Sequence, residues 1–142
     1  MKLTRIVVTQ AAPEKVAEFL CDFTTTNEWD PGTVHTELIS GDGGPGTRYR
    51  NVSKFLGRES ELVYTVQELE PGRRIALRGE NKTVTAHDTM TFEPQGTGTR
   101  VTYVVDFDFH GFAGFISPLL APALTRLADK GQAGMQEALG RL

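Results

Sequence analysis

The sequence predicts an α+β fold with about seven antiparallel strands, two short helices after the first strand and a long C-terminal helix. Between residues 33 and 109, β-rich runs alternate with turn residues at intervals of roughly 8–12 residues. No helical periodicity separates these runs, which favours an antiparallel sheet over parallel βαβ units. From Phe112 onward, apolar residues recur every three or four positions, the spacing of one helical face.

The first element is predicted to be a strand over residues 3–10, which are rich in β-branched side chains. Pro13 suits the first position of a helix, and Glu14 is favourable in its first turn. One apolar face of this helix is formed by residues at i, i+3, i+4 and i+7, namely Val16, Phe19, Leu20 and Phe23.

A second, very short helix is predicted from a capping box. Thr25 and Glu28 have the spacing at which both ends of this motif satisfy free backbone N–H groups. The turn residues Pro31 and Gly32 end the helix. Six strands follow, at 33–40, 47–55, 59–69, 73–78, 83–92 and 99–109.

The C-terminal helix is apolar nearly all round over Phe112–Ala128, which predicts burial on more than one side. Pro118 and Pro122 are expected to kink the helix or to delay its regular start. The apolar stretch is too short and too interrupted by proline to span a membrane, so no stable membrane insertion is expected.

Composition excludes several classes of protein. A chain of 142 residues suits one domain, expected over 1–142. Fifteen basic against eighteen acidic residues leave a formal charge of −3, whereas a dedicated nucleic-acid binder usually carries a basic face. The lone Cys21 cannot form an internal disulfide, and the first residues lack the apolar region of a secretory signal. A soluble, cytoplasmic protein is therefore expected.

Five stretches distributed along the whole chain carry a family resemblance: Ala12–Val16, Trp29–Gly32, Gly46–Tyr49, Glu68–Arg74 and Phe92–Tyr103. With this order of elements, the chain resembles the START-like (SRPBCC) superfamily and, within it, the polyketide cyclase/dehydrase-like group. The resemblance implies a helix-grip fold, in which a curved antiparallel sheet wraps around the C-terminal helix. It also implies a hydrophobic cavity between sheet and helix that holds lipids, polyketides, hormones or similar molecules.

Alternation along the strands shows which side chains face such a cavity. The inward set of the last strand contains the aromatic residues Tyr103, Phe107 and Phe109. Leu127 and Met135 would form the cavity floor, and Trp29 lies either at the cavity lip, as in the family, or at the closed end as a plug. The predicted cavity residues are Trp29, Tyr49, Asn51, Ser53, Tyr64, Asp88, Met90, Tyr103, Leu127 and Met135.

The predicted inner face is mainly apolar, with a few polar groups. Taken singly, each polar group is expected to be hydrogen-bonded to the backbone or at the cavity rim. Taken together, inward-facing Asn51, Ser53 and Asp88 favour a ligand site, because all three are costly to bury in a dry core.

Asp88 is the candidate catalytic residue. A carboxylate that faces an apolar cavity has a raised pKa and can act as a general base in aldol-type cyclisation or dehydration. The alternative is a structural salt bridge with Arg78 or another strand arginine near the cavity mouth. No inward-facing His or Arg is predicted to accompany Asp88, which weakens a catalytic role.

Other motifs are interpreted as structural. Gly41–Gly46 matches G-x-G-x-x-G, but it precedes an alternating strand, not a helix, so it is a predicted hairpin loop. His35, His87 and His110 lie on separate elements without the spacing of metal ligands, and Cys21 is expected to be a packed thiol. No cofactor and no metal are expected.

Three functional hypotheses follow. The first is a binding domain for a small hydrophobic molecule, such as a lipid or an aromatic or polyketide-like metabolite. The second is a polyketide cyclase or dehydratase that uses the acid and tyrosine residues of the cavity. The third is an interaction or dimerisation module, in which Phe112–Leu124 stays partly exposed and forms a homodimer or partner surface.

Overall fold

The computed structural model describes residues 1–142 and confirms the predicted fold class. The elements, in chain order, are β1 (Lys2–Thr9), α1 (Pro13–Cys21), one 3-10 turn (Phe23–Thr25), α2 (Thr26–Trp29), β2 (Thr33–Ser40), β3 (Arg48–Phe55), β4 (Arg58–Glu70), β5 (Arg74–Glu80), β6 (Val84–Gln95), β7 (Gly98–Phe109) and α3 (Phe112–Leu139).

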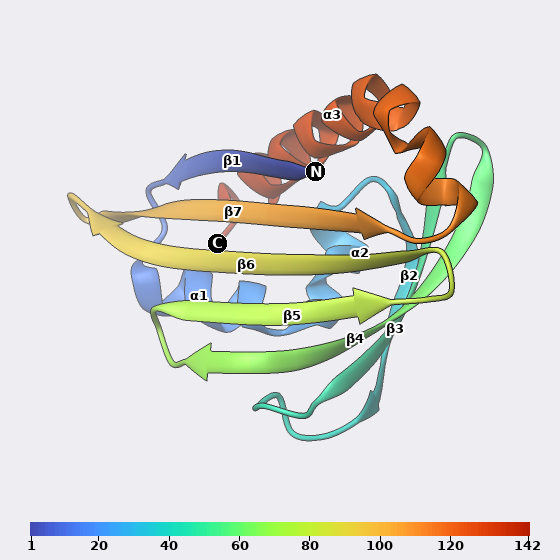
Figure 1. Ribbon diagram of the computed structural model, residues 1–142. Coiled ribbons are helices and arrows are strands. Elements are labelled where there is room, and N and C mark those ends of the chain that lie inside the picture. Colours follow the sequence, from blue (N-terminus) through green and yellow to red (C-terminus); the bar gives the residue numbers. More distant parts are fainter.

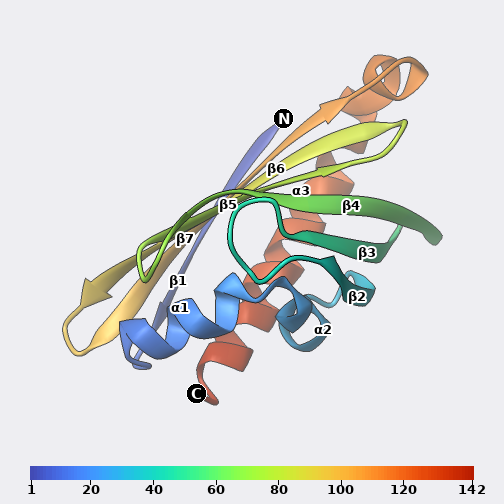
Figure 2. The ribbon, with the colours of Figure 1, turned by 90° about the horizontal axis from the view of Figure 1, so that it is seen from below.

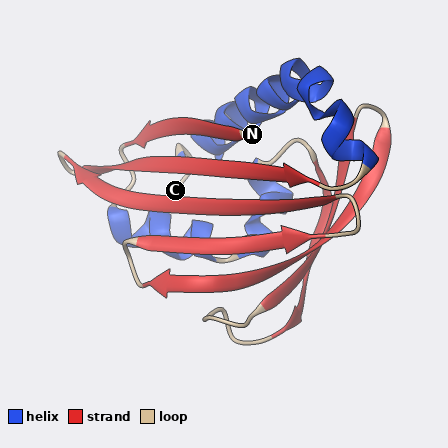
Figure 3. Ribbon diagram, viewed as in Figure 1, coloured by secondary structure: helices blue, strands red, loops and turns tan.

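All seven strands form one antiparallel sheet in the order β1-β7-β6-β5-β4-β3-β2. Sequential strands are neighbours from β2 to β7, and β1 adds to the far side of β7. The sheet curves strongly, and all three helices lie on the same side of it (Figures 1 and 3). Figure 2 shows α1 and α2 between the two edge strands, with α3 running obliquely across the same face.

The turn between α1 and α2 differs from the predicted capping box. Thr25 occupies the position before α2, but its side chain makes no capping bond; its hydroxyl donates to the carbonyls of Phe19 and Asp22 instead. The cap comes from Asp22, whose carboxylate accepts from the backbone N–H of Thr24 at 3.0 Å. Because the 3-10 turn precedes α2, the backbone N–H groups that need a cap lie one turn earlier in the chain than the sequence motif indicates.

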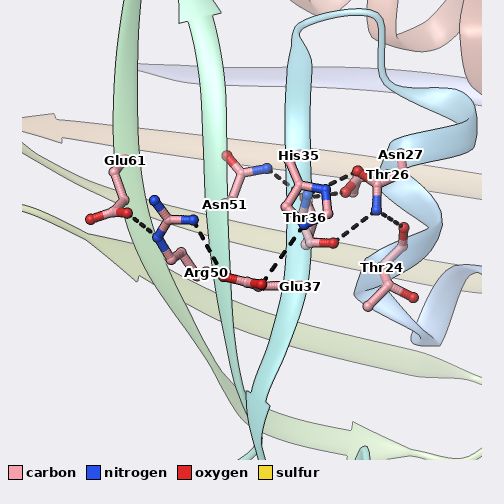
Figure 4. A network of polar contacts seen from close by, with 9 residues as sticks. All are labelled: Thr24, Thr26, Asn27, His35, Thr36, Glu37, Arg50, Asn51 and Glu61. Atoms are coloured by element: carbon pink, nitrogen blue, oxygen red, sulfur yellow. Dashed lines mark hydrogen bonds and ion pairs between the residues drawn. The ribbon is translucent and has the colours of Figure 1, made fainter.

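Side-chain amides cover both edges of the sheet. On β1, Gln132 and Gln136 of α3 donate to the carbonyls of Ile6 and Val8 at 2.8 and 2.7 Å. On β2, the amide of Asn27 donates to the carbonyl of Thr36 and accepts from its N–H, both at 2.8 Å (Figure 4). These bonds occupy backbone groups that would otherwise be free to pair with another strand.

The interior is filled with side chains at the end where α1 and the last turns of α3 meet the sheet. Val16 and Leu20 of α1 are buried there, as are Met135 and Leu139 of α3. Phe23 packs against the ring of Tyr64, with centroids 4.7 Å apart, and against that of Tyr49 at 5.7 Å. This packed half fixes the position of α3 relative to the sheet.

The first turns of α3 differ from the expected burial on more than one side. Phe112, Phe115 and Leu119 are 77%, 84% and 81% exposed. Figure 1 shows these turns at an angle to the remainder of the helix, in the region of Pro118 and Pro122, which agrees with the predicted kink. These three side chains lie on one side of the helix, and the sheet does not cover them.

The strands are longer than predicted at the β6–β7 hairpin. β6 extends to Gln95 and β7 starts at Gly98, with Pro94 opposite Thr99. The connection, which the predicted strand bounds place at residues 93–98, is therefore only two residues long. Gly96 has a positive φ of 61°, the conformation that a short hairpin turn favours.

Two glycines of α3 provide a test of how closely this helix packs. A Cβ on Gly134 would lie 2.0 Å from the Trp29 carbonyl oxygen, whereas a Cβ on Gly131 would lie 4.0 Å from the Trp29 ring. We expect Gly134→Ala to lower the free energy of unfolding by about 1–3 kcal/mol, because α3 must shift. Gly131→Ala should leave it unchanged or raise it by up to about 1 kcal/mol, since alanine favours helix.

Urea unfolding of both variants and the wild type measures the two effects. Equal destabilisation by the two substitutions would contradict the close approach of α3 to Trp29 at Gly134.

Candidate functional site

A cavity of about 520 Å³ lies between the curved sheet and the first part of α3. Seventeen of its 28 lining residues are hydrophobic, so the wall is mainly apolar. From the sheet, the wall includes Phe55 of β3 and the β7 residues Val105, Phe107 and Phe109, all partly exposed within the open interior. From α3 it includes Ile116, Leu120, Leu124 and Leu127. The volume is within the range of ~300–1,000 Å³ typical of small-molecule sites.

The cavity has an exposed mouth and a buried end. Leu56, Arg58 and Glu59 of the β3–β4 hairpin and Thr83 of the β5–β6 loop are lining residues exposed to solvent, so the mouth lies at that end of the sheet. Trp29 and Asp88, each 3% exposed, and Tyr64, 9% exposed, line the opposite end. The two ends of the cavity therefore differ in their exposure to solvent.

Seven of the ten predicted cavity residues belong to this wall: Trp29, Asn51, Ser53, Tyr64, Asp88, Tyr103 and Leu127. The other three, Tyr49, Met90 and Met135, face inward but are buried in the packed half of the interior, where helices cover them. Alternation assigns a side chain to a face of the sheet but not to a position along the strand. The part of these residues in ligand binding stays a prediction.

Asp88 on β6 and Tyr103 on β7 form the central polar contact of the buried end. Asp88 lies opposite Val105 and Tyr103 opposite Met90, so the two side chains are diagonal neighbours on the inner face. The Tyr103 hydroxyl donates to Asp88 Oδ2 at 2.5 Å, and Asp88 Oδ1 is buried without a partner. The salt bridge to Arg78 considered from the sequence is absent, because Arg78 is exposed on the outer face of β5, opposite His87, where it pairs with Glu80 at 3.4 Å.

Burial changes the acidity of this group of side chains. Desolvation raises the pKa of Asp88 from 3.8 to about 7, although the Tyr103 hydrogen bond lowers it and the nearby Asp30 raises it further. Desolvation also raises the pKa of Tyr103 and Tyr64 well above 10, and the Asp88 charge adds to both shifts. Asp88 therefore changes protonation near neutral pH, inside an apolar site.

Asn51 and Ser53, in contrast, have their hydrogen bonds satisfied within the protein. The Asn51 amide donates to the Thr36 hydroxyl at 2.8 Å, and its carbonyl accepts from Ser53 at 2.6 Å. The Thr36 hydroxyl also contacts that of Thr26 at 2.6 Å, so the network joins β3, β2 and α2 (Figure 4). These bonds give Asn51 a structural role, because they link β3 to its neighbour β2 and to α2.

Tyr64 owes its position to a glycine on the neighbouring strand. Gly79 is opposite Tyr64, and a Cβ there would lie 2.5 Å from the tyrosine ring. The ring therefore lies flat over the backbone of β5, while Phe23 packs against it at 4.7 Å. Only glycine at position 79 leaves space for this arrangement.

Four charged lining residues, Arg5, Asp30, Arg58 and Glu59, were missed in the sequence analysis, which predicted no inward Arg. Arg5 is in the wall, and its Nε donates to Asp129 of α3 at 2.8 Å; its alternation with Leu3 and Val7 was the available signal. Arg58 lies at the mouth, where strand alternation gives no information because the chain turns. Asp30 accepts from the Gly32 N–H and the Thr33 hydroxyl, both at 3.0 Å, in the turn after α2.

The remaining reactive residue types are apart from the cavity. His35 and His87 are exposed, and His110 contacts the Thr85 hydroxyl at 2.8 Å. Cys21 packs beside the core, and burial raises its pKa to about 11, which disfavours the thiolate. No group of three or more His, Cys, Asp or Glu side chains is arranged to hold a metal ion. None of the helices has the length and apolar character that a transmembrane helix needs.

A curved antiparallel sheet around a long C-terminal helix, with an apolar cavity between them, defines a START-like protein of the helix-grip class. A family model, described as polyketide cyclase / dehydrase and lipid transport, matches residues 1–141. The chain therefore belongs to this family, as the resemblance of its sequence motifs predicted. A comparison with the sequences of curated proteins gives no significant match.

Solved structures show the same fold at low sequence identity. The Zhui aromatase/cyclase from Streptomyces sp. R1128 superimposes with a TM-score of 0.84 at 18% identity, covering 99% of this chain and 94% of its own. The protein TTHA0849 from Thermus thermophilus gives 0.83 at 19% identity, covering 98% and 97%. A START superfamily protein from Mycobacterium smegmatis gives 0.75 at 17% identity, covering 98% and 94%.

The raised pKa of Asp88 predicts a pH dependence of stability. The folded state holds the Asp88 proton up to about pH 7, whereas an unfolded Asp loses it near 3.8, so unfolding releases a proton between these values. The contribution of Asp88 to the free energy of unfolding therefore falls as pH rises from about 4 to 7 and is constant above. We expect Asp88→Asn to remove this decline, which amounts to about 1–4 kcal/mol.

Urea unfolding at pH 4.5 and pH 8 measures the effect as the difference between wild type and variant. The exposed Asp108→Asn on β7 removes the same charge and should keep the wild-type pH dependence. An unchanged pH dependence in Asp88→Asn would contradict the raised pKa.

Proposed function

We propose that the protein binds a small, mostly apolar molecule in the cavity between the sheet and α3. The observation that carries this proposal is the cavity of about 520 Å³ with its mainly apolar wall. The last turns of α3 are buried in the hydrophobic core, whereas the first part of the helix borders the cavity. An apolar wall around an empty space lowers the stability of the fold, because its side chains lack the van der Waals contacts that a filled core provides. A bound apolar molecule would bury this wall.

The membership in a family of polyketide cyclases, dehydrases and lipid transport proteins supports the same proposal. So does the composition of the wall, in which polar groups are the minority and occur at the mouth and at the buried end. A site of this kind selects its ligand mainly by size and shape, and orients it by a small number of hydrogen bonds.

Neighbouring valines on β7 provide a matched test. Val105 lines the cavity, whereas Val104 belongs to the opposite face of the same strand. We expect Val105→Trp to fill part of the cavity and to weaken binding of the neutral fluorescent probe N-phenyl-1-naphthylamine at least tenfold. Val104→Trp should leave the affinity within about twofold, because its side chain does not enter the cavity.

Fluorescence titration of purified protein measures both affinities, and circular dichroism verifies that each variant is folded. Absence of probe binding to the wild type, or equal weakening by the two substitutions, would contradict binding in this cavity.

A second candidate function is that of a cyclase or dehydratase, favoured by the position and the pKa of Asp88. A carboxyl with a pKa near 7 can take a proton from a carbon next to a carbonyl group and return it later in the reaction. The structural neighbour described as an aromatase/cyclase agrees with this candidate. Turnover of an aromatic polyketone should be abolished by Asp88→Asn and retained by Asp108→Asn; equal turnover by both variants would exclude Asp88 as the base.

The third hypothesis, a homodimer or partner surface at Phe112–Leu124, has one supporting observation. Phe112, Phe115 and Leu119 are exposed on the side of α3 that faces away from the cavity. Exposed apolar groups of this size are typical of interaction surfaces. The identity of what covers them stays a prediction.

A further inference from the structure

The buried end of the cavity contains carboxyl groups that form no ion pair within the protein. These are the carboxyl groups of Asp30 and Asp88. Of the two basic lining residues, Arg58 lies at the exposed mouth beside Glu59, and Arg5, opposite Tyr103 in the β1–β7 pair, is bonded to Asp129. A ligand that reaches the buried end therefore meets two carboxyl groups without an ion pair, while the neighbouring Arg5 is already paired with Asp129.

Two polar atoms at this end are buried without a hydrogen-bond partner in the protein. They are Asp88 Oδ1, an acceptor, and Trp29 Nε1, a donor. Tyr103 connects them, because its ring packs edge-on against Trp29 with centroids 5.8 Å apart and its hydroxyl bonds Asp88 at 2.5 Å. The Trp29 donor and the Asp88 acceptor thus lie in one region of an otherwise apolar wall; we call Trp29, Asp88 and Tyr103 the polar corner. Buried polar groups without partners are rare in folded proteins.

We infer that the ligand carries a hydroxyl group, phenolic or alcoholic, which binds between Asp88 and Trp29, and that ligands with a carboxylate at this end are rejected. A hydroxyl can donate to Asp88 Oδ1 and accept from Trp29 Nε1 at the same time. This inference deepens the proposed function and rests on it. It narrows the ligand from any small apolar molecule to an uncharged molecule with a hydroxyl at its buried end.

Ligands whose polar end is a carboxylate or an ammonium group satisfy the hydrogen bonds of Asp88 Oδ1 and Trp29 Nε1 less well. A carboxylate can accept from Trp29, but it places a negative charge beside Asp88 and Asp30 in an environment that screens charge poorly. An ammonium group can donate to Asp88, but it has no acceptor for the Trp29 N–H. The raised pKa of Asp88 and of Asp30, both caused mainly by burial, agrees with an interior that disfavours negative charge.

Three probes with the same apolar body test the inference: heptylbenzene, 4-heptylphenol and 4-heptylbenzoate. Each is titrated at pH 8 against protein loaded with N-phenyl-1-naphthylamine, and displacement gives the affinity. We expect 4-heptylphenol to bind about tenfold more tightly than heptylbenzene, through its hydrogen bonds. We expect 4-heptylbenzoate to bind at least tenfold more weakly than the phenol, because of charge repulsion.

Two variants assign these preferences to the polar corner. Asp88→Asn keeps the shape but removes the charge, and should strengthen benzoate binding about tenfold. Asp108→Asn, with the same change on the exposed side of β7, should leave all three affinities unchanged. Trp29→Phe removes the N–H donor and should reduce the advantage of the phenol over heptylbenzene, which keeps the test decisive if Asp88→Asn does not fold.

The outcomes separate this inference from the proposed function. If heptylbenzene and the fluorescent probe bind but the phenol has no advantage, or the benzoate binds as tightly as the phenol, the hydroxyl assignment is wrong and the apolar cavity stands. If neither the fluorescent probe nor heptylbenzene binds, the proposed function is wrong and the inference falls with it.

Discussion

The close packing of the last half of α3 against the sheet and the turn after α2 is the constraint on which the rest of the structure depends. Gly134 allows the helix to lie directly on the Trp29 carbonyl, and Met135 and Leu139 are fully buried beside it. The sheet continues to curve beyond this contact, so the first half of the helix stands away from the strands. The cavity is thus a geometric consequence of where the helix is anchored, and its mouth lies at the β3–β4 hairpin and the β5–β6 loop. Figure 1 shows that α3 begins at the same end of the sheet.

Polar side chains inside the fold perform two different tasks. The network around Thr36 and Asn51 is internally satisfied and joins β2, β3 and α2, so its bonds stabilise the structure (Figure 4). The group formed by Trp29, Asp88 and Tyr103 is incompletely satisfied, and burial shifts the acidity of its carboxyl towards neutral pH. Incomplete satisfaction combined with a position in the cavity wall is what distinguishes a candidate ligand contact from a structural bond.

Much of this arrangement could be predicted from the sequence. Strand alternation correctly placed Asp88, Tyr64 and Tyr103 on the inner face, because a half-buried strand repeats every two residues. Neither strand alternation nor the helical repeat of α3 could separate the filled part of the interior from the hollow part, so Tyr49 and Met135 were assigned to the cavity. That division depends on how far α3 lies from each strand, which is a tertiary property. For the same reason, the stretch around Phe115 was expected to be buried on more than one side, and only the third hypothesis included the exposure that the structure has.

A crystal structure of the protein with bound 4-heptylphenol tests the central claim most directly, namely that the hollow end of this interior is a ligand site organised by Asp88 and Trp29. We expect electron density for the ligand inside the cavity, with its alkyl chain along β7 and α3 and its hydroxyl within hydrogen-bond distance of Asp88 Oδ1 and Trp29 Nε1. An interior filled by protein side chains, or a ligand bound only to the outer surface of α3, would contradict this claim.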